Sequence, residues 1–171
     1  MTDGDVPNAD PDDRDARAPV LVLGVGSDLR RDDAAGRRVA EAIAALELPG
    51  VQALSVHQLA PELAMQITDR RLVIVVDASI EEREGWVEDR DEVVVSAVDT
   101  IDAAGAMSHH LDVRGLLGLA SMVASAPQEV RTVAVPAHDL GIGTELSPTT
   151  RAHVREAVRR VIALCDEVAS R

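Results

Sequence analysis

Short apolar runs alternate with segments of helical spacing along most of the chain. Apolar runs of about four to eight residues are typical of strands, and a helical periodicity of apolar residues is typical of a helix with one buried face. The apolar runs lie at residues 19–23, 51–56, 72–76, 92–98 and 130–135. Helical patterns lie at residues 33–46, 61–65, 111–124 and from 147 onward. This alternation predicts an α/β fold, a three-layer α/β/α sandwich with a mainly parallel central sheet.

The run at residues 72–76 is apolar at every position and ends at Asp77. A strand of this kind is covered by helices on both faces. We therefore place it in the middle of the sheet, with Asp77 at its carboxyl end. Ser147 and Pro148 have the residue types of an N-cap and a first helical position, so they are expected to begin the last helix.

The composition restricts both the core and the partners. Trp86 is the only aromatic residue, so 26 Ala and 24 Val must supply much of the core. All 17 basic residues are Arg, which excludes a lysine Schiff base and a P-loop lysine. The formal net charge of −13 repels phosphate backbones and anionic lipids. We expect neither nucleic acid nor a membrane as a partner.

The length of 171 residues suits a single domain. Residues 1–18 contain six Asp, two Arg and two Pro with little apolar surface, which predicts a disordered acidic tail, and residues 19–171 are expected to form one α/β domain. Cys165 is the only cysteine and lies in a helical stripe of valines, so it is expected in the core. Acidic residues rather than a secretory leader follow Met1, which predicts a cytoplasmic protein.

The first strand ends in Gly24-Val25-Gly26, and Asp32 and Asp33 follow before the next helix. The glycines are similar to the start of a dinucleotide-binding fingerprint, but Leu29 stands at the place of its third glycine. A nicotinamide or flavin site is therefore not expected. Carboxylates at a helix start commonly cap free N–H groups, so capping is one interpretation of the two acids and a functional site is the other.

Asp77 and the histidines of Ser108-His109-His110 have comparable positions, after the central strand and before the third helix. Each also has a simpler interpretation: a cap or an ion pair with a neighbouring arginine for Asp77, and a surface position for the histidines. Ligands of an open α/β sheet bind beyond the carboxyl ends of its strands, where Asp33, Asp77 and one histidine can meet. Two carboxylates and an imidazole would suit a divalent transition metal.

Four segments carry a family resemblance, in this order along the chain: residues 21–36, 57–63, 75–78 and 108–111. They resemble the maturation endopeptidases of nickel-iron hydrogenases, whose first motif is an apolar strand, Gly-x-Gly, an aliphatic residue, two acids and a later glycine. The resemblance extends from about Val20 to Val168. Ser27 replaces the usual asparagine of that motif, and Ala34 stands where the family often has glycine.

The resemblance implies a three-layer α/β endopeptidase that removes a C-terminal peptide from the nickel-loaded large subunit of a nickel-iron hydrogenase. Its nickel contacts correspond to Asp33, Asp77 and His110, with His109 as the alternative after a shift of one residue. Asp33 and Asp77 are also the candidate catalytic residues, by an aspartic-type or a metal-dependent mechanism. Nickel is expected to be carried by the substrate precursor, another divalent metal being the alternative, and the enzyme is expected to be a monomer.

Two other function classes fit the same sequence. A non-enzymatic maturation chaperone that binds metal or the precursor would use the same three residues. A small-molecule or nucleotide-binding α/β domain is a further alternative, which the absent third glycine and the absent lysine disfavour.

Overall fold

The computed structural model describes residues 17–80, 92–99 and 111–170. The strands are β1 (Val20–Val25), β2 (Val51–Val56), β3 (Leu72–Ser79), β4 (Val94–Ala97) and β5 (Glu129–Pro136). The helices are η2 (Arg31–Ala34), α1 (Ala35–Ala45), η3 (Pro61–Leu63), α2 (Ala64–Ile67), α3 (Val113–Val123) and α4 (Pro148–Ala169). Every apolar run and helical pattern expected from the sequence corresponds to one of these elements.

The five strands form one sheet in the order β2-β1-β3-β5-β4. β1 pairs with β2 and β3 in parallel, β3 pairs with β5 in parallel, and β4 is antiparallel to β5 at the edge. β3 is therefore the middle strand, as its uninterrupted apolar run predicted. The mainly parallel sheet and the α/β fold class are confirmed.

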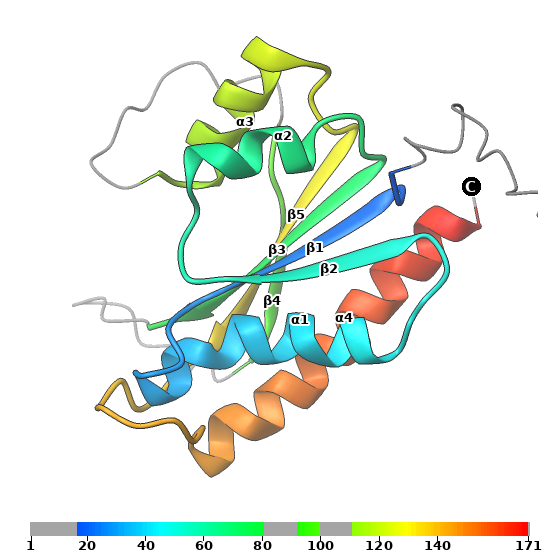
Figure 1. Ribbon diagram of the computed structural model, residues 1–171. Coiled ribbons are helices and arrows are strands. Elements are labelled where there is room, and N and C mark those ends of the chain that lie inside the picture. The colour runs from blue at the N-terminus through cyan, green and yellow to red at the C-terminus, as the bar shows by residue number, and fades with distance from the viewer. Residues whose placement is uncertain (1–16, 81–91, 100–110, 171) are drawn as a thin grey trace, which may run out of the picture.

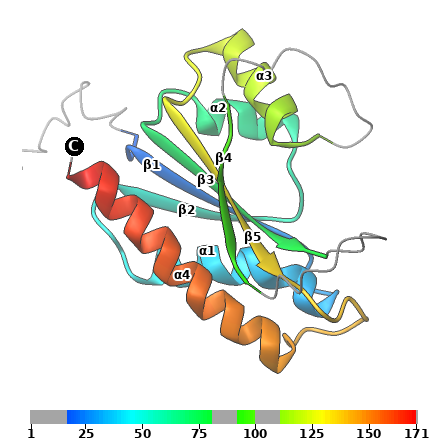
Figure 2. The same cartoon turned by 180° about the vertical axis from the view of Figure 1, so that it is seen from behind.

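Helices cover both faces of the sheet. α1 and α4 lie against one face, and α2 and α3 lie against the other (Figures 1 and 2). Successive residues of a strand point to opposite faces, so β1 contributes Val20 and Val22 to the core under α1 and α4, and Leu21 and Leu23 to the core under α2 and α3. The result is the expected three-layer sandwich with two apolar cores.

The start of α1 lies very close to the sheet because glycine occupies the contact. A Cβ atom added to Gly36 would lie 2.3 Å from the carbonyl oxygen of Val76 and 2.5 Å from that of Val25. One added to Gly24 would lie 2.2 Å from the carbonyl oxygen of Gly36. These glycines let the turn before α1 sit directly on the carboxyl ends of β1 and β3.

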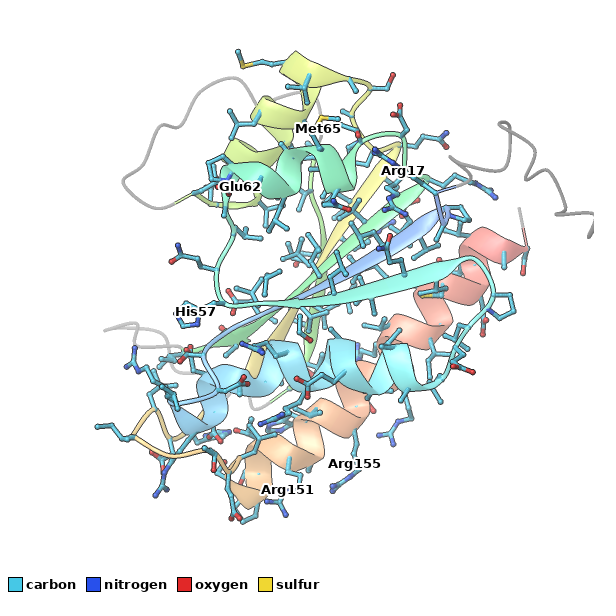
Figure 3. All side chains as sticks on the ribbon, in the orientation of Figure 1. Arg17, His57, Glu62, Met65, Arg151 and Arg155 are labelled. Atoms are coloured by element: carbon cyan, nitrogen blue, oxygen red, sulfur yellow. The ribbon has the colours of Figure 1, made fainter. Side chains whose placement is uncertain are left out.

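At the other end of the strands, where β1 and β3 begin, the buried side chain of Arg70 links several segments. It donates hydrogen bonds to the carbonyl oxygens of Ala18 and Gln66 and to the side chain of Gln52. Arg17, the first described residue, donates to the carbonyl oxygen of Met65 (Figure 3). Residues 1–16, most of the expected acidic tail, lie outside the described residues, and the division into a tail and one domain stays a prediction.

Cys165 is buried in the core under α4, as predicted, and burial raises the pKa of its thiol to about 11. Ser147 is the N-cap of α4, accepting a hydrogen bond from the Thr150 N–H, and Pro148 is its first residue. In the described part of the chain, no helix is long and apolar enough to cross a membrane.

Replacement of Gly36 by alanine should lower the free energy of unfolding by about 1–3 kcal/mol, because the added methyl group overlaps two backbone carbonyl groups. Urea denaturation followed by circular dichroism measures the change. Gly118→Ala, in the middle of α3, is the matched control, since alanine has the higher helix propensity there. Equal stability of Gly36→Ala and the unmodified protein would contradict the close approach of α1.

Candidate functional site

The candidate site lies at the edge where the parallel strands end. β1 leads into the turn that contains η2, β3 ends just beyond Asp77, and β5 leads into the loop that precedes α4. These connections lie together on the left of Figure 1, beside the N-terminus of α4. Ligands of parallel α/β sheets bind at this edge, because the strand ends leave a crevice there.

Asp33 is half-buried in the turn between β1 and α1. Its Oδ2 atom accepts a hydrogen bond of 3.0 Å from the Ser27 N–H. Gly26 has a φ of 141°, and a Cβ atom there would lie 1.8 Å from the carbonyl oxygen of Asp33. Ser27 also accepts a hydrogen bond of 3.4 Å from the Leu29 N–H through its hydroxyl oxygen. Serine thus provides a polar side chain to the turn in place of the family's asparagine.

Asp77 lies on β3 near its carboxyl end, with one side of its side chain open to solvent. Its Oδ1 atom accepts a hydrogen bond of 2.8 Å from the Ala78 N–H. The surrounding protein shields the Asp77 carboxylate from water, which raises its pKa to about 6. The hydrogen bond from the Ala78 N–H lowers the pKa, and the negative charge of Asp33 raises it further. Asp77 therefore changes its protonation state close to neutral pH.

Asp33 and Asp77 lie on neighbouring segments at this edge of the sheet. Gly36 packs against the carbonyl groups of Val25 and Val76, so the turn that contains Asp33 lies over the end of β3, and the charge of Asp33 contributes to the raised pKa of Asp77. His109 and His110 lie outside the described residues. Within residues 17–80, 92–99 and 111–170, no group of three His, Cys, Asp or Glu side chains is arranged to hold a metal. The metal-binding and catalytic roles of Asp33, Asp77 and His110 stay predictions.

Asp32 has a role that the sequence did not reveal. Its carboxylate is fully buried and accepts five hydrogen bonds. The donors are the N–H groups of His138, Asp139 and Ser147 at 3.0, 2.8 and 2.6 Å, and the hydroxyl groups of Ser147 and Thr150 at 2.8 and 2.9 Å. Asp32 thereby joins the turn before α1 to the loop after β5 and to the first turn of α4.

The capping interpretation was wrong for the helix that follows Asp32 and Asp33, because neither η2 nor α1 has a side-chain cap. Asp32 instead accepts hydrogen bonds at the start of α4, more than 110 residues later. The position of Asp32 beside Asp33 in the sequence did not indicate these long-range hydrogen bonds. The sequence signal that could have found it is the Ser147 to Thr150 segment, whose N–H and hydroxyl groups can bind a carboxylate.

The ionised state of Asp32 is strongly favoured. Burial alone would raise the pKa of Asp32, but the N–H groups of Ser147 and His138, the Ser147 hydroxyl group and the Asp139 N–H together lower it to about 2. Asp32 therefore remains charged over the range in which Asp77 titrates. The pKa values of Asp32 and Asp77 differ because different numbers of hydrogen-bond donors surround the two carboxylates.

No protein-family model matches the sequence, and a search of curated proteins gives no significant match. Solved structures do match. The hydrogenase maturating endopeptidase HybD from E. coli is 25% identical with a TM-score of 0.70, over 87% of this chain and 93% of that one.

Two archaeal structures agree with this result. The [NiFe] hydrogenase maturation protease HybD from Thermococcus kodakarensis is 25% identical with a TM-score of 0.64, over 85% of this chain and 97% of that one. The hydrogenase 2 maturation peptidase from Thaumarchaeota archaeon SCGC_AB-539-E09 is 26% identical with a TM-score of 0.65, over 86% of this chain and 97% of that one. The predicted resemblance to the hydrogenase maturation endopeptidases is confirmed. The chain spans nearly the whole length of these maturation endopeptidases.

Replacement of Asp32 by asparagine should lower the free energy of unfolding by about 3 kcal/mol or more at pH 7, because a buried amide cannot accept all five hydrogen bonds. Because the folded-state pKa is lowered, the carboxylate stabilises the protein above about pH 4 and this stabilisation, of about 2 kcal/mol, is lost as the pH falls toward 2. Urea titrations from pH 2 to 7 measure both effects. Asp166→Asn on the surface of α4 is the control, and an unchanged stability of Asp32→Asn would contradict this role.

The raised pKa of Asp77 gives a stability effect of opposite sign. Folding favours the protonated acid, so the protein loses stability as the pH rises from about 4 to about 6. Asp77→Asn should therefore be more stable than the unmodified protein at pH 7, by less than about 1 kcal/mol given solvent screening, and equally stable below pH 4.

Carbon-13 NMR of the carboxyl groups measures the same property directly. Asp77 should titrate near pH 6, and Asp33→Asn should move that midpoint downward because it removes the neighbouring negative charge. An equal midpoint in both proteins would show that the two acids do not interact, and a midpoint near 4 in the unmodified protein would contradict the raised pKa.

Proposed function

We propose that the chain is an endopeptidase that removes a C-terminal peptide from the nickel-loaded precursor of a nickel-iron hydrogenase large subunit. The observation that carries this proposal is the pair of carboxylates at the strand ends of a fold shared with hydrogenase maturation endopeptidases. The names of those structures support hydrolysis of a hydrogenase precursor. The nickel contact is a finer statement, which rests on the sequence resemblance.

The carboxylate pair suits hydrolysis because Asp77 can exchange a proton near neutral pH. Asp77, with its pKa of about 6 and Asp33 as a charged neighbour, can hold or release a proton near neutral pH. In the aspartic-type form of the proposal, one carboxylate takes a proton from the attacking water while the other gives a proton to the peptide group. In the metal-dependent form, the substrate's metal polarises the scissile carbonyl group and the acids hold the water.

The donor set also fits recognition of a metal that the precursor carries. Asp33 and Asp77 provide carboxylate oxygens at one edge, and the resemblance assigns the imidazole to His110, which lies outside the described residues. Carboxylate and imidazole ligands suit divalent transition metals. We propose that these residues bind the nickel of the precursor and thereby align the scissile bond with the carboxylate pair.

Asp77→Ala should abolish removal of the peptide while the fold persists, since the side chain accepts one hydrogen bond from its own neighbour and is partly open to solvent. The measurement is the intact mass of purified nickel-loaded and nickel-free precursor after incubation with each protein. Asp166→Ala, on the surface of α4 at the opposite end of the sheet, is the matched control and should cleave normally. Normal processing by Asp77→Ala would contradict the site.

The same experiment separates the alternatives. Cleavage of the nickel-loaded precursor alone supports metal recognition, and cleavage of both forms supports an aspartic-type reaction independent of nickel. Binding of the precursor with no loss of mass would favour the non-enzymatic chaperone. The cytoplasmic location and the monomeric state stay predictions.

A further inference from the structure

Exposed apolar side chains gather at the edge that holds the carboxylate pair. Among the described residues, seven large apolar side chains are exposed, and three of them follow the carboxyl ends of strands. These are Leu29 after β1, Ile80 after β3 and Ile142 after β5. Single exposed apolar residues are common on protein surfaces, so what matters is whether any of the three are neighbours.

Leu29 and Ile142 are neighbours because their two loops are joined by backbone pairing. Arg30 and Gly143 form a parallel bridge, with hydrogen bonds from the Gly143 N–H to Leu29 at 3.0 Å and from the Arg31 N–H to Gly143 at 2.9 Å. Leu29 and Ile142 each come directly before a bridged residue, so the bridge brings their two loops side by side. Leu29 is 68% exposed and Ile142 is 92% exposed, so both side chains are open to solvent.

Further hydrogen bonds connect the loops of Leu29 and Ile142 to the turn that contains Asp33. The Arg31 side chain bonds the carbonyl oxygen of Ile142 at 3.4 Å and the carboxylate of Asp139 at 2.5 Å. Gly143 has a φ of 156°, and a Cβ atom there would lie 2.9 Å from the Arg31 side chain. The Asp32 N–H donates to the carbonyl oxygen of Asp139, and Asp33 is the next residue. The apolar pair and Asp33 thus belong to one hydrogen-bonded unit.

The charge around the pair indicates the kind of partner. Arg30 is exposed, and among the described residues its side chain has no hydrogen bond or ion pair. It offers a cation on the residue that follows Leu29, on a protein of net charge −13. A second copy of this chain would bring the same large negative charge, which opposes self-association. A peptide with apolar side chains and a nearby acidic group complements this surface.

We propose that Leu29, Ile142 and Arg30 form a docking surface for the segment of the hydrogenase precursor that adjoins the cleaved bond. The surface binds two apolar side chains of that segment on Leu29 and Ile142 and an acidic group on Arg30. It rests on the proposed function for the identity of the partner. Its position in the chain, a few residues before Asp33, places the bound segment next to the carboxylate pair.

The test measures cleavage kinetics and binding of the purified nickel-loaded precursor. Leu29→Ser/Ile142→Ser should raise KM at least tenfold with kcat within twofold, because burial of two large apolar side chains on binding is lost. Arg30→Glu should raise KM by a similar factor. Met122→Ser, an equally exposed apolar residue on α3, and Arg155→Glu, an exposed arginine on α4 (Figure 3), are the matched controls and should leave KM unchanged.

Binding is measured separately in Asp77→Asn protein, which is not expected to cleave the precursor. There the double substitution should weaken the Kd for the precursor by the same factor, with an unchanged melting temperature. Unchanged Kd and KM would overturn the docking surface, as would a dimer of the unmodified protein that the double substitution dissociates. Failure of the unmodified protein to cleave would instead overturn the proposed function, while the Kd comparison still decides the docking surface.

Discussion

A single buried carboxylate holds together the edge of the sheet on which the site is built. Asp32 accepts hydrogen bonds from the loop after β5 and from the first turn of α4, and its backbone continues directly into Asp33. An unpaired buried charge would be very unfavourable, so the five donors and the carboxylate must be assembled together. The position of Asp33 over β3 therefore depends on contacts made more than 100 residues away in sequence.

Much of the fold could be predicted from the sequence, because it depends on local patterns. The apolar run of β3 predicted a strand covered on both faces, and Ser147 with Pro148 predicted the start of α4. The nearness of Asp33 and Asp77 was predictable in outline too, since parallel strands bring their carboxyl ends to one edge. That inference required only the strand ends and their order along the chain.

The rest could not be read from the sequence because it depends on contacts between distant segments. Nothing near Asp32 indicates that its partners are a serine and a threonine at the start of the last helix. Likewise, Leu29 and Ile142 are unremarkable apolar loop residues until the bridge between Arg30 and Gly143 makes them neighbours. Pairing of this kind has no periodicity that a sequence reveals, and β4 gave no sign that it runs antiparallel.

The contrast between Asp32 and Asp77 explains how identical side chains serve different purposes at this edge. The hydrogen-bond donors around Asp32 keep its pKa near 2, so Asp32 stays ionised and its role is to join the segments at this edge. Asp77 has one N–H donor and a like-charged neighbour, so its negative charge is poorly compensated. In the proposed function, the substrate's metal provides the positive charge that Asp77 lacks and would lower the pKa of Asp77. Binding of the loaded precursor is then coupled to loss of the proton from Asp77, because the metal favours the ionised carboxylate.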